Sequence, residues 1–111
     1  MPTMTKPPKS IFDLIDKEEF RKRTAMYIGD KDIMVLKSFI DGYFYATWTN
    51  DIEVDDKVIF GDFHEWVARQ FKWKESTAGW ARIILSECNG DGKLAVDKFF
   101  ELYDIFKARD K

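Results

Sequence analysis

The chain contains one cysteine and one histidine, the residue types most often used for nucleophilic attack and zinc binding. Cys88 continues an apolar stripe with Trp80 and Ile84, which predicts a small buried hydrophobe and not a nucleophile. His64 lies in the first turn of a predicted amphipathic helix, beside Glu65. One cysteine and one histidine do not make a zinc site. The sequence therefore predicts no catalytic residue, no metal ion and no cofactor.

Residues 89–94 have the spacing found in the middle of a calcium-binding loop, with Asn89 and Asp91 two positions apart. In that alignment the first ligand would be Glu87, and Lys98 would occupy the twelfth position. Calcium requires a bidentate carboxylate at the twelfth position, and a lysine there repels the ion. The stretch is therefore predicted to be a tight turn between two helices.

The main concentration of charge is an acidic connector at residues 50–56, which contains four carboxylates and no cation. Clustered carboxylates speed association with basic partners. Trp73, between charged neighbours at a predicted helix end, is a further candidate anchor. The predicted partner-binding residues are Asp51, Glu53, Asp55, Asp56, Trp73 and Glu75. The alternative is that the connector is only a solvated loop.

The other three tryptophans lie on apolar stripes of predicted helices. The spacing of Trp48, Trp66 and Trp80 favours packing in the core. Exposed tryptophans can also stack on nucleic-acid bases. However, a formal net charge of −2 argues against a general nucleic-acid binder. We therefore expect no direct nucleic-acid partner.

Composition indicates a small cytoplasmic protein. With 111 residues, of which 45% are hydrophobic, the chain can bury a core without cross-links. A single cysteine excludes an internal disulfide framework and suits a reducing compartment. Prolines interrupt the first ten residues, so no signal peptide is expected. No apolar run approaches the roughly 20 residues that a membrane span requires.

Apolar spacing predicts an all-α fold, with a mobile tail at residues 1–9 and a single domain at residues 10–111. Four main helices are expected, preceded by one or two short ones. The first main helix, which begins after Asp32, is apolar on more than one face, and this favours a central position. Gly42 within it predicts that another backbone packs close by, because a mid-helix glycine is otherwise unfavourable.

The stretch RKRTAMYIGD at residues 21–30 resembles a signature of the gyrase B subunit, which binds ATP. It departs from the family pattern at Thr24 and Ala25. That family also needs a helix bearing glutamate and asparagine, and a glycine-rich loop over the phosphates, and neither follows here. We therefore interpret the stretch as a structural joint, in which Gly29 takes a positive φ and residues 26–28 are irregular and largely buried.

A longer pattern carries a second resemblance, through the segments 21–30, 36–43, 63–67, 79–85 and 99–103. Over residues 10–107 the chain resembles the small helical immunity proteins of bacterial contact-dependent growth inhibition and other polymorphic-toxin systems. The resemblance implies a cytoplasmic inhibitor, not an enzyme, that binds one toxin domain and blocks its active site. Many such toxins are nucleases with basic active sites, which an acidic surface could occupy. The alternative is a small helical adaptor without a toxin partner, which would carry an exposed apolar groove.

Overall fold

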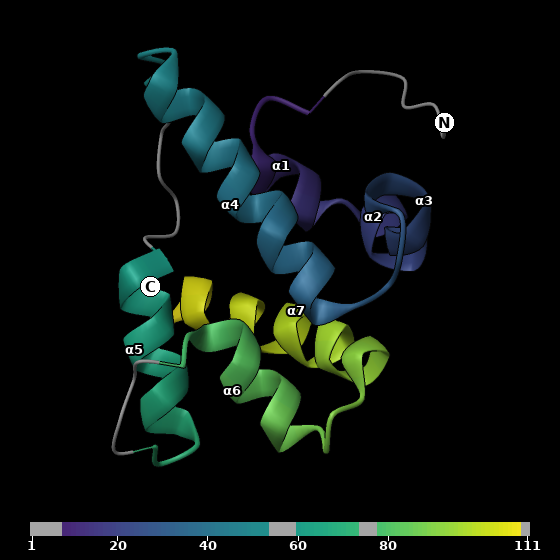
Figure 1. The fold of residues 1–111 in the computed structure, drawn as a ribbon, viewed down its shortest axis with the longest axis vertical. Coiled ribbons are helices and arrows are strands. Elements are labelled where there is room, and N and C mark those ends of the chain that lie inside the picture. Colours follow the sequence, from purple (N-terminus) through teal and green to yellow (C-terminus); the bar gives the residue numbers. More distant parts are fainter. Residues whose placement is uncertain (1–7, 54–59, 74–77, 110–111) are drawn as a thin grey trace.

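The structure, a computed structural model, describes residues 8–53, 60–73 and 78–109. Helices account for all the regular structure in these ranges, so the predicted all-α fold is confirmed. Three are short and four are longer, as Figure 1 shows: α1 (Ile11–Asp16), α2 (Glu18–Lys22), α3 (Thr24–Ile28), α4 (Ile33–Thr49), α5 (Phe60–Gln70), α6 (Trp80–Glu87) and α7 (Gly92–Ala108). Most of the predicted N-terminal tail lies outside the described residues. Within the described ranges, none of the helices combines the length and apolar character that crossing a bilayer requires.

The core is centred on α7, which contacts α4, α5 and α6. Its apolar residues recur three and four positions apart and form one buried stripe. This stripe consists of Ala95, Val96, Phe99, Phe100, Leu102, Tyr103 and Phe106. Phe63 of α5 and Trp80 of α6 pack against the ring of Phe99, at centroid distances of 5.7 and 5.0 Å. The C-terminal helix therefore holds the other long helices together.

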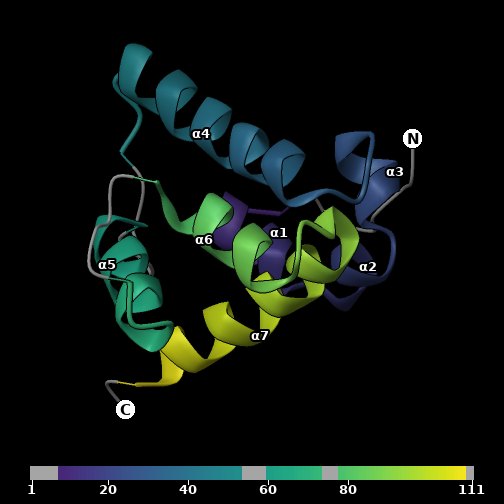
Figure 2. The same cartoon turned by 60° about the horizontal axis from the view of Figure 1, so that its bottom comes forward.

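The prediction that α4 is central is wrong. In Figure 2, α4 lies along the upper side of the molecule, and α6 and α7 lie below it. Its buried residues are Ile33, Leu36 and Ile40, all in its first ten residues. The core fully covers only one face of the helix. Met34, Phe39, Tyr43 and Phe44 pack partly against the core, whereas Tyr45 and Trp48 are exposed.

The start of α4 is fixed against the start of α7. Asp32 caps α4, and its Oδ2 accepts hydrogen bonds from the backbone N–H groups of Met34 and Val35 at 2.9 and 3.3 Å. The same carboxylate lies against Gly92, where an added methyl group would overlap Oδ1 and come within 2.9 Å of Cγ. A cap of this kind satisfies amide donors that otherwise lack partners. The lack of a side chain at Gly92 therefore makes room for the carboxylate of Asp32.

We expect Gly92→Ala to lower the unfolding free energy by about 1 kcal/mol, the usual value of an N-cap, because the new methyl group displaces Asp32. Urea unfolding of the two single variants Gly92→Ala and Asp32→Ala, and of the double variant, measures this coupling. In the Asp32→Ala background, Gly92→Ala should no longer destabilise the protein. Equal costs of Gly92→Ala in both backgrounds would contradict the steric explanation.

Gly42 supplies the matched control, and here the sequence-based prediction is wrong. Gly42 is exposed, and a methyl group added there would meet no atom within 4 Å outside its own helix. No other backbone approaches it in the described part of the chain. Gly42→Ala should therefore raise the unfolding free energy by about 1 kcal/mol, through helix propensity alone.

The stretch at residues 21–30 forms the end of α2, the whole of α3 and the turn toward α4. Its first residue, Arg21, connects three elements. The guanidinium donates to both carboxylate oxygens of Asp104 on α7 at 2.7 Å, and Nε donates to the carbonyl of Ile15 at 2.8 Å. It also lies 4.9 Å from the ring centre of Phe100. Arg21 is therefore a structural clamp between α1, α2 and α7.

The rest of this stretch differs from expectation at residues 26–28, which are helical and only partly covered. The side chain of Met26 is 57% exposed, and Tyr27 and Ile28 are half-buried. The helix ends where Gly29 takes a φ of 97°, as predicted, and its N–H donates to the carbonyl of Ala25 at 2.9 Å. The stretch is therefore a joint, built as a short helix with a glycine stop.

Candidate protein-binding surface

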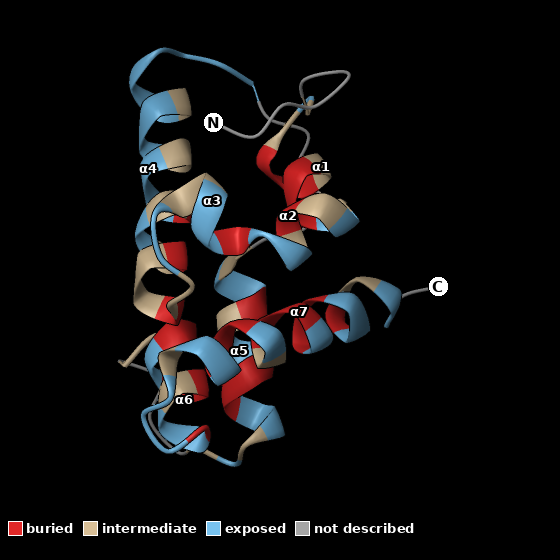
Figure 3. Cartoon of the chain, turned by 90° about the vertical axis from the view of Figure 1, so that its right-hand side faces the viewer, coloured by how far each residue is buried: buried red, intermediate tan, exposed pale blue. Residues whose placement is uncertain are grey.

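The C-terminal half of α4 contains no buried residue, although it includes four aromatic side chains. Figure 1 shows its last turns extending beyond the other helices, and Figure 3 shows this end of α4 without buried positions. Phe44 packs sideways against Phe12 and Phe60, at centroid distances of 5.9 and 5.8 Å. The outward face has no such cover in the described part of the chain.

That outward face carries two exposed aromatic side chains, and a third exposed apolar side chain follows in the turn after the helix. Tyr45, Trp48 and Ile52 are 64%, 75% and 58% exposed. The two rings contact each other, with centroids 6.0 Å apart and planes tilted by 55°. Tyrosine and tryptophan are over-represented among the residues that dominate binding energy in protein interfaces. An exposed pair of them on one helix end is therefore a candidate anchor.

The turn after α4 fixes the position of the first acidic residue. Asp51 has a left-handed φ of 52°, and its N–H donates to the carbonyl of Trp48 at 3.3 Å. The N–H of Ile52 donates to the carbonyl of Thr47 at 2.9 Å. These two bonds form the common helix-ending motif in which the left-handed position is usually glycine. Asp51 and Ile52 are therefore held against the last turn of α4.

Two of the predicted binding residues lie here, next to the aromatic pair. Asp51 and Glu53 are exposed, and neither has an ion-pair partner among the described residues. Asp55 and Asp56, predicted with them, lie outside the described residues. Below, the aromatic–acidic surface denotes Tyr45, Trp48, Asp51, Ile52 and Glu53.

Trp73 does not belong to this surface. It follows α5, whose C-terminal end lies opposite the C-terminal end of α4 along the long axis in Figure 1. The predicted partial exposure of Trp73 is confirmed, but its ring packs against the core and its Nε1 donates to Glu87 Oε2 at 3.3 Å. Its own N–H donates to the carbonyl of Ala68 at 2.9 Å. These contacts give Trp73 a role in closing α5 against α6. Glu75 lies outside the described residues.

The expectation that Trp48 packs in the core is wrong, whereas Trp66 and Trp80 are buried as predicted. A signal in the sequence did exist. Tyr45 and Trp48 are three residues apart, which places them on one face of α4. That face differs from the face of the three buried residues of α4. Two apolar stripes on one helix therefore indicated a second surface.

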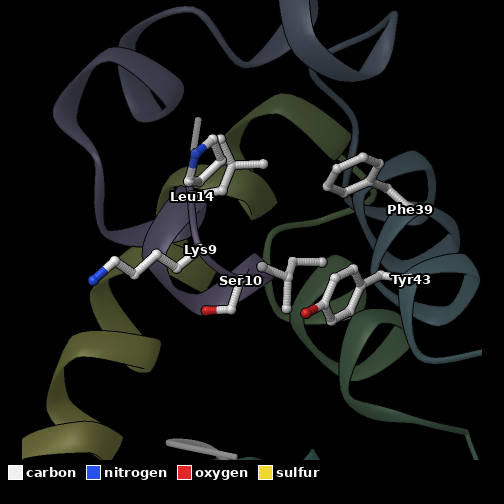
Figure 4. Close-up of a pocket in the computed structure, with 7 residues that line it drawn as sticks. Lys9, Ser10, Leu14, Phe39 and Tyr43 are labelled. Carbon is white, nitrogen blue, oxygen red and sulfur yellow. The ribbon is translucent and has the colours of Figure 1, made fainter. Parts of the chain in front are cut away.

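An apolar groove lies between α1 and α4, with a volume of about 200 Å³. Its walls are Pro8, Lys9, Ser10, Ile11 and Leu14 on one side, and Phe39 and Tyr43 of α4 on the other. Figure 4 shows the two α4 rings facing Leu14 and Ser10 across the groove. The groove therefore opens on a different face of α4 from Trp48 and Tyr45.

Cys88 and His64 do not form a reactive pair in the structure. Cys88 is buried as predicted, and burial raises the pKa of its thiol. An attacking cysteine needs the opposite shift, because the thiolate is the nucleophile. Among the described residues, no hydrogen bond joins the two side chains, and no group of three or more potential metal ligands of the His, Cys, Asp and Glu types comes together.

The turn at residues 89–92 is the predicted tight connection between helices. Asn89 and Gly90 have left-handed φ values of 56° and 80° and end α6. Asp91 then caps α7, with its Oδ1 accepting a hydrogen bond from the N–H of Leu94 at 3.1 Å. The side chain of Asp91 thus has a structural use, and the prediction of a tight turn is confirmed.

Comparison with known proteins gives no match to a protein-family model, to a curated protein or to a solved structure. The functional argument therefore rests on the geometry of the aromatic–acidic surface and on the residues around it.

Proposed function

We propose that the protein is a toxin-neutralising immunity protein, which binds a cognate toxin domain of nuclease type and blocks its active site. The observation that carries the proposal is the aromatic–acidic surface at the end of α4. It combines a large apolar anchor with carboxylates that lack ion-pair partners among the described residues. Such an arrangement is suited to binding a protein, and its aromatic pair and carboxylates make no contact with the core among the described residues.

Charge favours a basic partner. A nuclease active site is basic because it binds phosphates, and carboxylates at Asp51 and Glu53 complement it. The sequence adds Asp55 and Asp56 two and three residues later. The same carboxylates repel the phosphates of DNA or RNA, so a direct nucleic-acid partner is disfavoured.

The surface is best regarded as the centre of an interface. A stable interface of ordinary size involves about 20–30 residues on each side. A few central residues, most often tryptophan, tyrosine and arginine, supply most of its binding energy. We assign that role to Trp48 and Tyr45, with the carboxylates around them increasing the association rate.

The test is binding to the C-terminal domain of the protein encoded by the neighbouring gene, as the candidate toxin, measured by surface plasmon resonance at several salt concentrations. Trp48→Ala should raise Kd about 30-fold, equivalent to about 2 kcal/mol. A second variant replaces four carboxylates by the corresponding amides, at Asp51, Glu53, Asp55 and Asp56. This variant should mainly associate more slowly, and its association rate should depend less on the salt concentration. The matched control is Met26→Ala, which changes an exposed apolar side chain elsewhere and should leave Kd unchanged.

If Trp48→Ala and the neutralised variant both bind the toxin domain like the unmodified protein, the aromatic–acidic surface is not the interface. If the neighbouring gene product neither binds nor is inhibited, the immunity function itself is wrong.

The groove between α1 and α4 favours a second candidate, a small helical adaptor that holds an apolar side chain of a partner without any toxin. Phe39→Ala would alter the groove and leave Trp48 in place. A protein partner other than a toxin domain, whose binding is lost on Phe39→Ala and unchanged on Trp48→Ala, would support the adaptor instead of the immunity protein.

A further inference from the structure

The protein contains an internal example of how its own side chains hold an arginine. The guanidinium of Arg21 lies 4.9 Å from the ring centre of Phe100. Its two terminal nitrogens donate to the two carboxylate oxygens of Asp104, each at 2.7 Å. An aromatic face and a carboxylate thus hold one guanidinium together, through a cation–π contact and paired charge-assisted hydrogen bonds.

The aromatic–acidic surface has the same two components without the cation. Among the described residues, cations lie over the rings of Phe100, Tyr103 and Phe106, and none lies over Trp48 or Tyr45. Asp51 and Glu53 likewise lack a cationic partner within the described ranges. The backbone N–H of Asp51 donates to the carbonyl of Trp48. This hydrogen bond fixes the backbone of Asp51, which carries the carboxylate, beside Trp48.

We propose that the aromatic–acidic surface binds an arginine side chain of the partner, with its guanidinium over Trp48 and its N–H groups donating to Asp51 and Glu53. This inference rests on the proposed function, since it names the group on the partner that the surface recognises. The partner is a protein that presents an exposed arginine, as a basic active site does.

Arginine suits the surface better than lysine does. Its planar guanidinium stacks on an aromatic face, carries five donors and is more weakly hydrated than an ammonium group. Tryptophan provides the most favourable ring for such a contact. The 75% exposure of Trp48 leaves most of its side chain available to an incoming planar group.

The experiment uses the full chain labelled with nitrogen-15 and three blocked pentapeptides, Gly-Ser-X-Ser-Gly, in which X is arginine, lysine or citrulline. Citrulline has the shape of arginine but no charge. Proton–nitrogen correlation spectra record the backbone amides and the indole N–H signals of the four tryptophans. Trp48→Phe identifies the indole signal of Trp48.

The arginine peptide should shift the Trp48 indole signal and the amides of Asp51 and Glu53, and leave the indoles of Trp66 and Trp80 in place. The lysine peptide should bind more weakly, and the citrulline peptide should produce no shift. The double variant Asp51→Asn, Glu53→Gln should weaken arginine binding about fivefold. Asparagine tolerates the left-handed backbone at position 51, so this variant removes charge without straining the turn.

Three results would overturn the proposal: equal shifts from arginine and citrulline peptides, no shift of the Trp48 indole at tens of millimolar arginine peptide, or stronger shifts of the same signals by a short oligothymidylate. The last result would indicate base stacking instead. These outcomes are separate from the failure of the proposed function. A toxin domain that binds through Trp48 while the arginine peptide does not would preserve the immunity role and exclude the arginine contact. Binding of the arginine peptide without inhibition of a toxin would preserve the arginine contact and exclude the immunity role.

Discussion

Phe63→Ala is expected to lower the unfolding free energy by about 3–5 kcal/mol, the usual cost of removing a buried phenylalanine. Phe63 is fully buried, and its ring lies at the meeting point of α5, α6 and α7. The surrounding rings, at centroid distances of 5.3–6.4 Å, belong to Phe60, Trp66, Trp80, Phe99, Tyr103 and Phe106. Close-packed rings from three helices cannot collapse into the vacated space without losing contacts elsewhere. Urea unfolding followed by circular dichroism measures the loss.

Such a loss is a large part of the total stability of a small domain, about 5–15 kcal/mol. Phe63→Leu, which leaves a smaller cavity, should cost less than Phe63→Ala. Trp48→Ala is the matched surface control and should change the unfolding free energy by no more than about 0.5 kcal/mol. A similar loss for Trp48→Ala and Phe63→Ala would mean that the end of α4 is packed in solution.

Arg21→Met is expected to lower the unfolding free energy by about 1–2 kcal/mol at neutral pH, after allowance for the partial exposure of the pair. Methionine keeps an apolar stem beside Phe100 but removes the donor to the carbonyl of Ile15 and the paired donors to Asp104, which then keeps a longer contact with Lys107 at 3.8 Å. Arg21→Lys should be intermediate, because lysine keeps the charge but cannot form the paired contact.

This contribution should depend on pH in a definite direction. The hydrogen bond from Arg21 holds the pKa of Asp104 below its ordinary value. Since the folded-state pKa is the lower one, the stabilisation is complete above the unfolded-state pKa of about 4. It is lost as the pH falls through the folded-state value.

The difference in unfolding free energy between the unmodified protein and Arg21→Met should therefore narrow below about pH 4. A series of urea unfolding curves through the acid range measures this. If the difference stays constant with pH, the stabilisation comes from the contacts with Ile15 and Phe100, and the ion pair contributes little.

The helices of this fold could be predicted from the sequence because apolar spacing and turn residues determine structure over a few neighbouring residues. The stop at Gly29 and the turn before Asp91 follow from the backbone preferences of glycine and from side-chain caps. Both were predicted, and both are present.

Which apolar face meets the core was not accessible in the same way. The sequence of α4 supports more than one apolar stripe, and only the positions of α6 and α7 decide which stripe is covered. Trp48 was therefore assigned to the core and is exposed. The position of α7 at the centre depends likewise on long-range packing.

Trp73 shows a different limit. Its charged neighbours correctly predicted partial exposure. Its structural role arises from Lys72, whose left-handed φ of 58° returns the chain toward the end of α5. A lysine gives no local signal for that conformation, which glycine usually adopts. The sequence therefore did not reveal the contacts of Trp73 with α5 and α6, and its role as a binding anchor stays a prediction.

The absence of buried residues in the second half of α4 has a consequence for how this protein can diversify. Substitutions at exposed positions usually change stability by less than about 0.5 kcal/mol. Positions 45, 48 and 53 can therefore vary among related chains, or in a randomised library, with little effect on folding. If the proposed aromatic–acidic surface is the interface, recognition is separated from the aromatic core, and a new specificity can be selected on an unchanged scaffold. Under the proposed function, retargeting the protein to a different basic domain should begin with changes at this end of α4 and in the turn that follows it.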